Sequence, residues 1–429
     1  MKIRDFLFAA AICTAGLAGC SKDKDNEVVN PVIEDEGVPT TISLSISQPK
    51  TYAVDNNATP AELAFNTVDI LIYKGTNLVK HVKLKGTDFE ETTTGENKYK
   101  IKEKIETTTG IKDIYVGVNL PAAIRSAITA NEVKGSLSTI NRTTIATLTD
   151  TSTGFAMFST AGIERTLVEE DDATYSTVNT LEVPVERLVA KVTVQSDENL
   201  NYNVAGGTLS DIQFGIRNSN KLIYALQQKD GSGTVIDPNY EPSQYDADDF
   251  EHLYSGYTAI NDYDTPVLNL SHKYAPENTS SSHLTRETTY ASIRAKFRPE
   301  EFADENGELY TNQNPGAVTF WLVKYNNGDT KYFENEADAD KFLTTVSGTK
   351  TKYEDGYTYY NMFLNPKGKY NTIRNTYYKT TINSITGLGN STGEEGGNTT
   401  DPVESPTTID FIIDIVEWQL IENGYDLSI

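Results

Sequence analysis

The chain is poor in the residues from which most active sites and metal sites are built. Its 429 residues include two cysteines and four histidines. The motifs H-E-x-x-H and C-x-x-C and the phosphate-binding P-loop do not occur, so zinc-protease, dithiol and nucleotide chemistry have no recognisable site. We therefore expect a protein that is not an enzyme and that carries no metal and no cofactor.

Positive charge is also scarce. There are 37 lysines and arginines against 61 acidic residues, a formal net charge of −24, so nucleic acid and anionic lipid surfaces are not expected partners. Two acidic runs, Glu169–Asp172 and Asp246–Asp249, could bind calcium weakly. Neither run has the spacing of a calcium-binding loop, and such runs are more often solvated loops.

Both cysteines lie near the start of the chain. Lys2 and Arg4 precede an uncharged, largely apolar run from Phe6 to Gly16, which is too short to span a bilayer and is typical of a secretory signal. The sequence Leu17-Ala18-Gly19-Cys20 that follows has the form of a bacterial lipobox. It predicts cleavage before Cys20, lipidation of its thiol and delivery to the outer membrane, with acyl chains as the only anchor. The alternative is that Cys20 is an ordinary small residue of a signal peptide.

What the chain has in quantity is tyrosine and threonine, which suit half-buried pleated surfaces. With 25 tyrosines against two tryptophans, and short alternating segments separated by turn signals, the sequence predicts a mainly β fold with sandwich domains and a few short helices. The expected strands are 42–47, 68–73, 99–105, 114–118, 181–195, 290–297, 317–325, 357–364 and 377–385, and the expected helices are 122–130 and 334–344.

The first strand looks removable. Ile42, Leu44 and Ile46 alternate with serines in the period-2 pattern of a half-buried strand. Polar segments lie on both sides of it, and a trypsin-like protease could cut in the second of these, between Lys50 and Thr51. The alternative is that Lys50 is an ordinary loop lysine.

A strongly β-prone segment follows the Gly- and Asn-rich linker 387–408. One face carries Ile409, Phe411, Ile413 and Ile415, and the other carries Ile412, Val416, Trp418 and Leu420. So apolar a strand must be buried, either in its own fold or in a neighbour's, because an exposed one would aggregate. Burying four such side chains contributes about 6–12 kcal/mol before ordering costs.

Several short motifs together resemble the fimbrillins of Bacteroidales, the subunits of type V pili, and most closely the shaft subunit of the short fimbria. These motifs are Thr41–Leu44, Val185–Val192, Ile293–Phe297, Phe363–Pro366, Ile373–Lys379, Ile382–Ile385 and Val416–Trp418. The resemblance implies two transthyretin-like β-sandwich domains. We expect a signal peptide over 1–19, a tether and removable strand over 20–50, a first domain over 51–192, a second over 193–386, a linker over 387–408 and a donor strand over 409–429.

The resemblance also implies a mechanism. A surface protease removes the first strand, and the last strand of the next subunit fills the groove, so that subunits join head to tail into an open filament. The implied partners are further copies of the chain, anchor and tip subunits, the maturation protease and ligands on host or bacterial surfaces. Relatives matured by an arginine-specific protease have Arg at the cut, whereas this chain has Lys50. A tip or accessory adhesin, or an outer-membrane glycan-binding lipoprotein with tandem β-sandwiches, are the alternatives.

Overall fold

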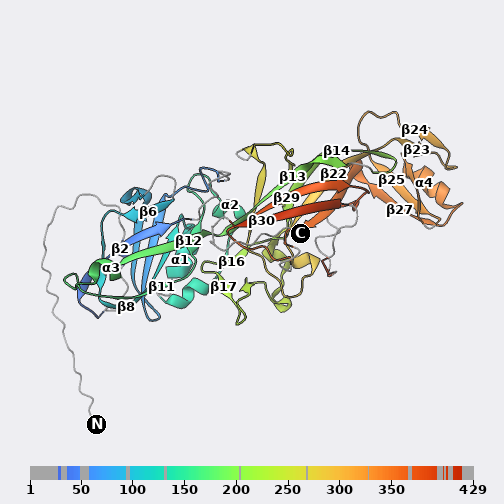
Figure 1. Cartoon of the computed structure of the whole chain (residues 1–429). Helices are drawn as coiled ribbons and strands as arrows, with labels where there is room; N and C mark the ends of the chain where they lie inside the picture. The colour runs from blue at the N-terminus through green and yellow to red at the C-terminus, as the bar shows by residue number, and fades with distance from the viewer. Residues whose placement is uncertain are drawn as a thin grey trace, which may run out of the picture.

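A computed structural model describes residues 28–29, 36–48, 58–92, 97–129, 133–201, 204–266, 269–326, 328–365, 370–393, 400, 402–403 and 409–417. The protein is mainly β, as the sequence predicts, and Figure 1 shows an elongated molecule in which the two halves of the chain lie end to end. Within the described residues, no helix is both long enough and apolar enough to cross a membrane.

The first half is built on one large curved sheet with the strand order β1-β4-β3-β8-β10-β12-β2-β6-β5, to which β7 and β11 add at its sides. Its elements are β1 Val28–Val29, β2 Pro39–Ser47, β3 Thr67–Lys74, β4 Asn77–Lys85, β5 Phe89–Glu91, β6 Lys98–Ile101, β7 Ile105–Thr108, β8 Gly110–Val118, α1 Ala122–Thr129, β9 Ile140–Arg142, α2 Ile145–Leu148, β10 Met157–Ser159, β11 Ile163–Leu167, α3 Tyr175–Val178 and β12 Thr180–Arg187.

The second half is a sandwich of two four-stranded sheets, β21-β13-β29-β30 and β20-β14-β22-β28. Its elements are β13 Val189–Asn201, β14 Gly207–Arg217, β15 Ser219–Asn220, β16 Leu222–Tyr224, β17 Gln228–Lys229, β18 Val235–Ile236, β19 Phe250–Glu251, β20 Tyr254–Ala259, β21 His272–Pro276, β22 Tyr290–Pro299, β23 Glu301–Ala303, β24 Leu309–Thr311, β25 Phe320–Tyr325, β26 Asp329–Phe333, α4 Glu336–Leu343, β27 Gly348–Tyr353, β28 Tyr357–Phe363, β29 Thr376–Ile385 and β30 Ile409–Glu417. Aliphatic and aromatic side chains from both sheets fill one core. Strands β25–β27 and α4 form a smaller cluster at the far end of the molecule (Figure 1).

The two cores meet where β12 passes into β13. Val189 belongs to the first hydrophobic cluster and Ala190 to the second, because consecutive side chains of this segment face different cores. The sequence places the domain boundary after residue 192, and this position stays a prediction.

The segment expected to be one strand over 99–105 is two strands, and this expectation is wrong. β6 pairs with β2 at Ser45–Ser47 and β7 pairs with β2 at Pro39–Ile42, so both follow the same partner. The bend between them carries Lys102, Glu103 and Lys104, which are all exposed. Charged side chains that face water do not favour a continuous ladder here.

Candidate functional site: the first and last strands

β2 is an interior strand of the sheet, and its backbone is hydrogen-bonded to neighbouring strands along both edges. One edge pairs in parallel with β12, from Ser43 opposite Thr180 to Ser47 opposite Pro184. The other edge pairs antiparallel with β6 and β7. If β2 left, two rows of backbone N–H and C=O groups would face an open slot, and such edges readily accept another strand.

The inward face of β2 is part of the core of the first half. Ile42, Leu44 and Ile46 are each fully buried, and they pack in one cluster with residues of β12 such as Val183. Burial of the three contributes about 5–9 kcal/mol. The slot that β2 fills is therefore apolar along its floor.

A buried asparagine ties the amino-terminal part of β2 to the loop before β12. Asn179 is 1% exposed, and its Nδ2 donates to Thr40 Oγ1 (3.1 Å) and to the carbonyl of Thr41 (2.9 Å). The Thr40 hydroxyl in turn donates to the carbonyl of Val168 at 2.7 Å, and the backbone N–H of Ser43 donates to the Asn179 carbonyl at 2.9 Å. We call Asn179, with the Val168 carbonyl, the polar latch of the slot.

The first acidic run also contacts β2. The Thr41 hydroxyl donates to Glu170 Oε1 at 2.5 Å and also bonds to the hydroxyl of Tyr175. The Lys104 ammonium lies over the ring of this tyrosine. In the second run, Asp249 pairs with Arg142. Within the described part of the chain, no group of three or more His, Cys, Asp or Glu side chains could hold a metal ion.

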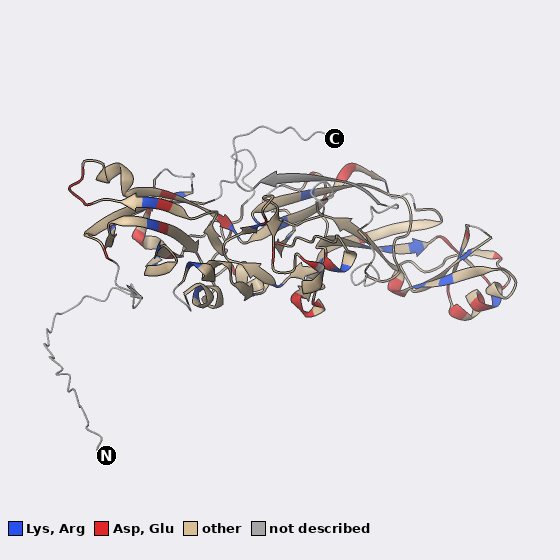
Figure 2. Ribbon diagram, turned by 90° about the horizontal axis from the view of Figure 1, so that it is seen from below, with Lys and Arg blue, Asp and Glu red and all other residues tan. Residues whose placement is uncertain are grey.

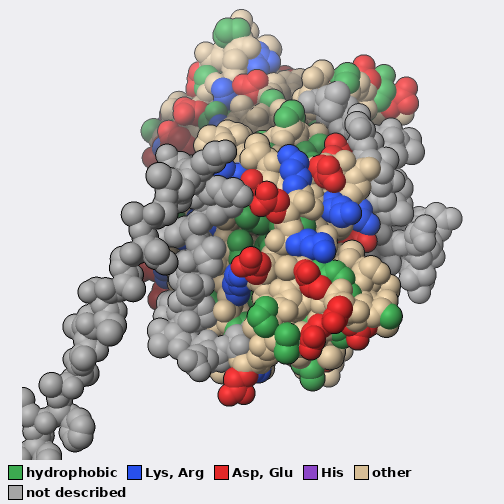
Figure 3. All heavy atoms as spheres, turned by 90° about the vertical axis from the view of Figure 1, so that its left-hand side faces the viewer, with side chains coloured by type: hydrophobic (Ala, Val, Ile, Leu, Met, Phe, Trp, Pro, Cys, Tyr) green, Lys and Arg blue, Asp and Glu red, His purple; other side chains and the backbone are tan. Residues whose placement is uncertain are grey.

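The residues predicted for lipidation and cleavage, Cys20, Lys50 and Thr51, lie outside the described residues. Upstream of β2, the short strand β1 pairs with β4 at Val82 and His81. The predicted propeptide therefore supplies two strands to the first half, β1 at an edge of its sheet and β2 in the interior of that sheet. Figure 3 looks onto this end of the molecule, where basic and acidic side chains mix and hydrophobic ones are scattered on the surface between the grey atoms.

β30 is held differently from β2. It pairs antiparallel with β29, from Ile409 opposite Ile385 to Glu417 opposite Thr376, and it is the last strand of its sheet. Ile412 is 52% exposed. Trp418 and Leu420 lie outside the described residues, as do the side chains of Ile409, Phe411, Ile413, Ile415 and Val416. A strand paired on one edge only is easier to detach than one paired on both.

The residues just after the predicted cleavage loop are anchored between the two halves. Glu62 is fully buried, and its Oε1 accepts from Lys191 Nζ at 2.9 Å and from the hydroxyl of Tyr274. Its carbonyl accepts from the Arg187 guanidinium at 3.1 and 3.2 Å. Burial lowers the pKa of Arg187 to about 10, although the charge of Glu62 opposes this. These bonds hold the chain that follows the loop, and none of them involves a residue before the loop.

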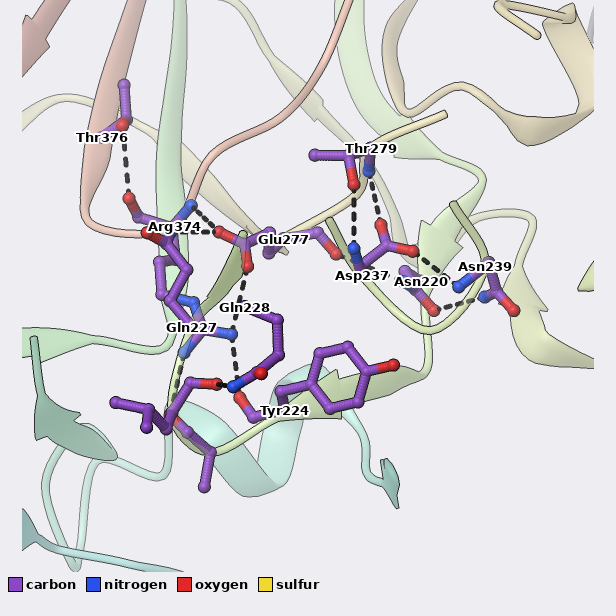
Figure 4. Close-up of polar contacts among 12 residues, drawn as sticks. Asn220, Tyr224, Gln227, Gln228, Asp237, Asn239, Glu277, Thr279, Arg374 and Thr376 are labelled. Carbon is purple, nitrogen blue, oxygen red and sulfur yellow. Dashed lines mark hydrogen bonds and ion pairs between the residues drawn. The ribbon is translucent and has the colours of Figure 1, made fainter. Parts of the chain in front are cut away.

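A second buried network lies beside the same junction (Figure 4). Arg374 donates to the carbonyls of Ala225 and Tyr224 at 3.0 and 2.8 Å, and its guanidinium lies 3.2 Å from Glu277 Oε2. Glu277 Oε1 also accepts from Gln227 Nε2 at 2.7 Å. Arg374 belongs to the motif Ile373–Lys379, and its role here is structural.

The model of the fimbrillin C-terminal region, described as major fimbrial subunit protein type IV, matches residues 351–424. The C-terminal region of the chain is therefore similar to that of the fimbrillins. The matched residues run from β27 through β28 and β29 to β30, so they include the last strand and the strand on which it lies. The proteins that this model describes are major fimbrial subunits.

One solved structure shows the same fold at low identity. It is a fimbrilin from Porphyromonas gingivalis W83, which is 13% identical, with a TM-score of 0.50, and the alignment covers 90% of the present chain and 99% of that chain. A candidate cell adhesion protein from Parabacteroides distasonis is 14% identical, with a TM-score of 0.48 and coverage of 89% and 100%. The tip fimbrial protein Mfa3 from Porphyromonas gingivalis is 12% identical, with a TM-score of 0.41 and coverage of 88% and 100%. No curated protein matches the sequence.

Sequence patterns did not single out Asn179 or Glu62 in this chain. Each is a lone polar residue without a distinctive spacing, and its burial depends on strands far away in the sequence. The one available signal is that Asn179 directly precedes a strand of alternating apolar residues.

Proposed function

We propose that this chain is a fimbrillin exported as a lipoprotein on Cys20, and that proteolysis between β2 and Thr59 starts its polymerisation. The cut releases lipid, tether, β1 and β2 together, and the strand β30 of a second copy fills the emptied slot. Repetition of this step builds a filament that serves adhesion.

The pairing of β2 carries this proposal. β2 is a nine-residue strand with an apolar inward face. The chain that follows the predicted cleavage loop is anchored separately, through Glu62. β30 also has nine residues, alternates apolar side chains on one face, and is bonded along one edge only. The two strands thus match in length and in pattern, as a leaving strand and its replacement must.

The test follows assembly of the full chain after treatment with a trypsin-like protease. Filaments are read as heat-sensitive ladders on denaturing gels. Deleting Ile409–Ile429 is expected to leave a folded monomer that gives no ladder. Ladders from the truncated protein would contradict the proposal.

A matched pair of substitutions separates the two faces of the strand. Ile413→Asp places a charge on the face that enters the apolar slot, so ladders should be lost. Ile412→Lys places a charge on the opposite face, and ladders should persist. Thermal unfolding of both variants before processing controls for loss of fold.

A further inference from the structure

The same four residues open the removable strand and lead into the last strand. β2 opens with Pro39-Thr40-Thr41-Ile42, and Pro406-Thr407-Thr408-Ile409 leads into β30. After the shared isoleucine both sequences continue with apolar residues at every second position, Leu44 and Ile46 in one and Phe411 and Ile413 in the other.

The two threonines of β2 are recognised by named groups of the slot. Thr40 is 4% exposed, and its hydroxyl both accepts from Asn179 and donates to the Val168 carbonyl. An aliphatic residue at this place would remove one hydrogen bond from the buried Asn179 amide and one from the half-buried Val168 carbonyl, which is unfavourable. A threonine in an incoming strand can reproduce both bonds.

Resting on the strand exchange proposed above, we propose that the shared tetrapeptide sets the direction and register of the incoming strand. Residues 407–415 of a second copy enter parallel to β12, as β2 does. Thr407 takes the place of Thr40 at the polar latch. Ile409, Phe411 and Ile413 then take the places of Ile42, Leu44 and Ile46 in the core.

The charges beside the slot favour the same register. Ser47 lies opposite Lys98 on one side and Pro184 on the other, and Asp414 would take its place beside the lysine. Ser45 lies opposite Glu182 on one side and Lys100 on the other, and there the incoming strand carries the uncharged Ile412. Opposite charges directly across strands are favourable and like charges are not.

A shift of two residues loses both advantages. With Phe411 in the place of Ile42, Asp410 would take the place of Thr41, which lies opposite Glu106 and bonds to Glu170, and Ile409 would meet the amide of Asn179. The latch and these charges therefore agree on one alignment. In the proposed alignment Asp414 also adds an ion pair with Lys98, which pairs with Glu182 at 2.6 Å in the precursor.

Disulfide trapping tests the alignment, because both native cysteines, Cys13 and Cys20, precede the cleavage loop. Full chains with Lys98→Cys are mixed with chains carrying one donor cysteine, processed, and oxidised. The proposed alignment puts Asp414→Cys opposite Lys98→Cys, within the distance a disulfide spans. The reversed direction would instead trap Asp410→Cys, and the two-residue shift would trap Val416→Cys.

Covalent dimers are expected from the Asp414→Cys mixture, in at least tenfold excess over the other two. Ladders without this cross-link would overturn the register and leave strand exchange standing. No ladder from the unmodified processed chain would overturn strand exchange and the register with it.

A second measurement probes the latch. Thr407→Val should lower the temperature at which ladders dissociate, whereas Thr407→Ser, which keeps the hydroxyl, should restore it. The unprocessed monomer, in which Thr40 still fills the latch, should unfold at an unchanged temperature in both variants. Equal ladder stability of the valine and serine variants would contradict the proposed contact.

Discussion

Asn179 shows at the scale of one residue how a strand can be held firmly and still be replaceable. Its side chain bonds a hydroxyl and a main-chain carbonyl of β2, and its own carbonyl accepts from a third residue of that strand. Only the bond to the Thr40 hydroxyl depends on a side chain of β2, because the other two involve its backbone. The same groups therefore remain available to a second strand.

Replacing this amide should weaken the precursor. Asn179→Ala leaves the half-buried Val168 and Thr41 carbonyls with fewer donors, so the free energy of unfolding should fall by about 1–3 kcal/mol. Urea unfolding of the unprocessed protein measures it. Asn199→Ala, at an exposed position in β13, serves as the control and should change little.

Glu62 is the residue-scale link between the two halves. Glu62→Gln removes the negative charge that the buried Lys191 and Arg187 face, and should cost about 3–5 kcal/mol. Lys191→Met alone should also destabilise. The double variant should lose less than the sum of the two, and simple additivity in urea unfolding would show that the pair is not coupled.

Two buried carboxyls predict the direction of a pH effect. Burial raises the pKa of Glu186 to about 7, although Arg374 opposes this, and burial also raises that of Asp237 to about 7. The folded protein therefore binds these protons more tightly than the unfolded chain. Their favourable contribution is fully present below the unfolded pKa, near 4, and is lost as the pH rises toward 7, by up to about 1.4 kcal/mol per pH unit for each group.

Urea unfolding at pH 5, 6 and 7 measures this slope. The double variant Glu186→Gln and Asp237→Asn should be less sensitive to pH than the parent over this range. Equal slopes would show that the two carboxyls do not titrate as described.

At the scale of the element, β2 and its neighbour β12 should respond differently to the same kind of change. Leu44→Ala removes a fully buried side chain and should destabilise the precursor by about 2–5 kcal/mol. It should not alter the heat resistance of assembled ladders, since β2 is absent from them. Val183→Ala in β12 should weaken both states, because β12 remains in the filament.

At the scale of the whole molecule, acidic and basic side chains are distributed along an elongated body (Figure 2), and the two halves carry different parts of the proposed joint. The slot lies in the first half and the strand that fills it lies on the second. Such a contact between unlike surfaces continues from copy to copy without closing.

The amino terminus of the mature chain tests this arrangement. Gln48 is 3% exposed at the end of β2 and Glu62 is anchored, so the cut is expected between them, after Lys50 if the protease is trypsin-like. Lys50→Gln should then abolish processing and ladders, whereas Lys324→Gln, at an exposed position in β25, should not. Mass spectrometry of surface protein that begins at Cys20 with lipid would contradict the proposal.

The alternating pattern of Ile42, Leu44 and Ile46 was sufficient to predict β2, and the apolar run from Ile409 was sufficient to predict β30. A period of two is a local property, so the sequence by itself determined that both segments are strands and that each needs a partner. It also determined the mainly β class, through composition and the spacing of turns.

Only the tertiary structure decided which partners those strands have. The parallel pairing of β2 with β12, the split of 99–105 into β6 and β7, and the burial of Asn179 and Glu62 join residues that are distant in the chain. Such contacts depend on how the sheets fold around a core, and the local periodicity of the sequence does not specify that folding. The tetrapeptide shared by the first and last strands could be read from the sequence, but it became informative only when the structure showed the latch that its threonine meets.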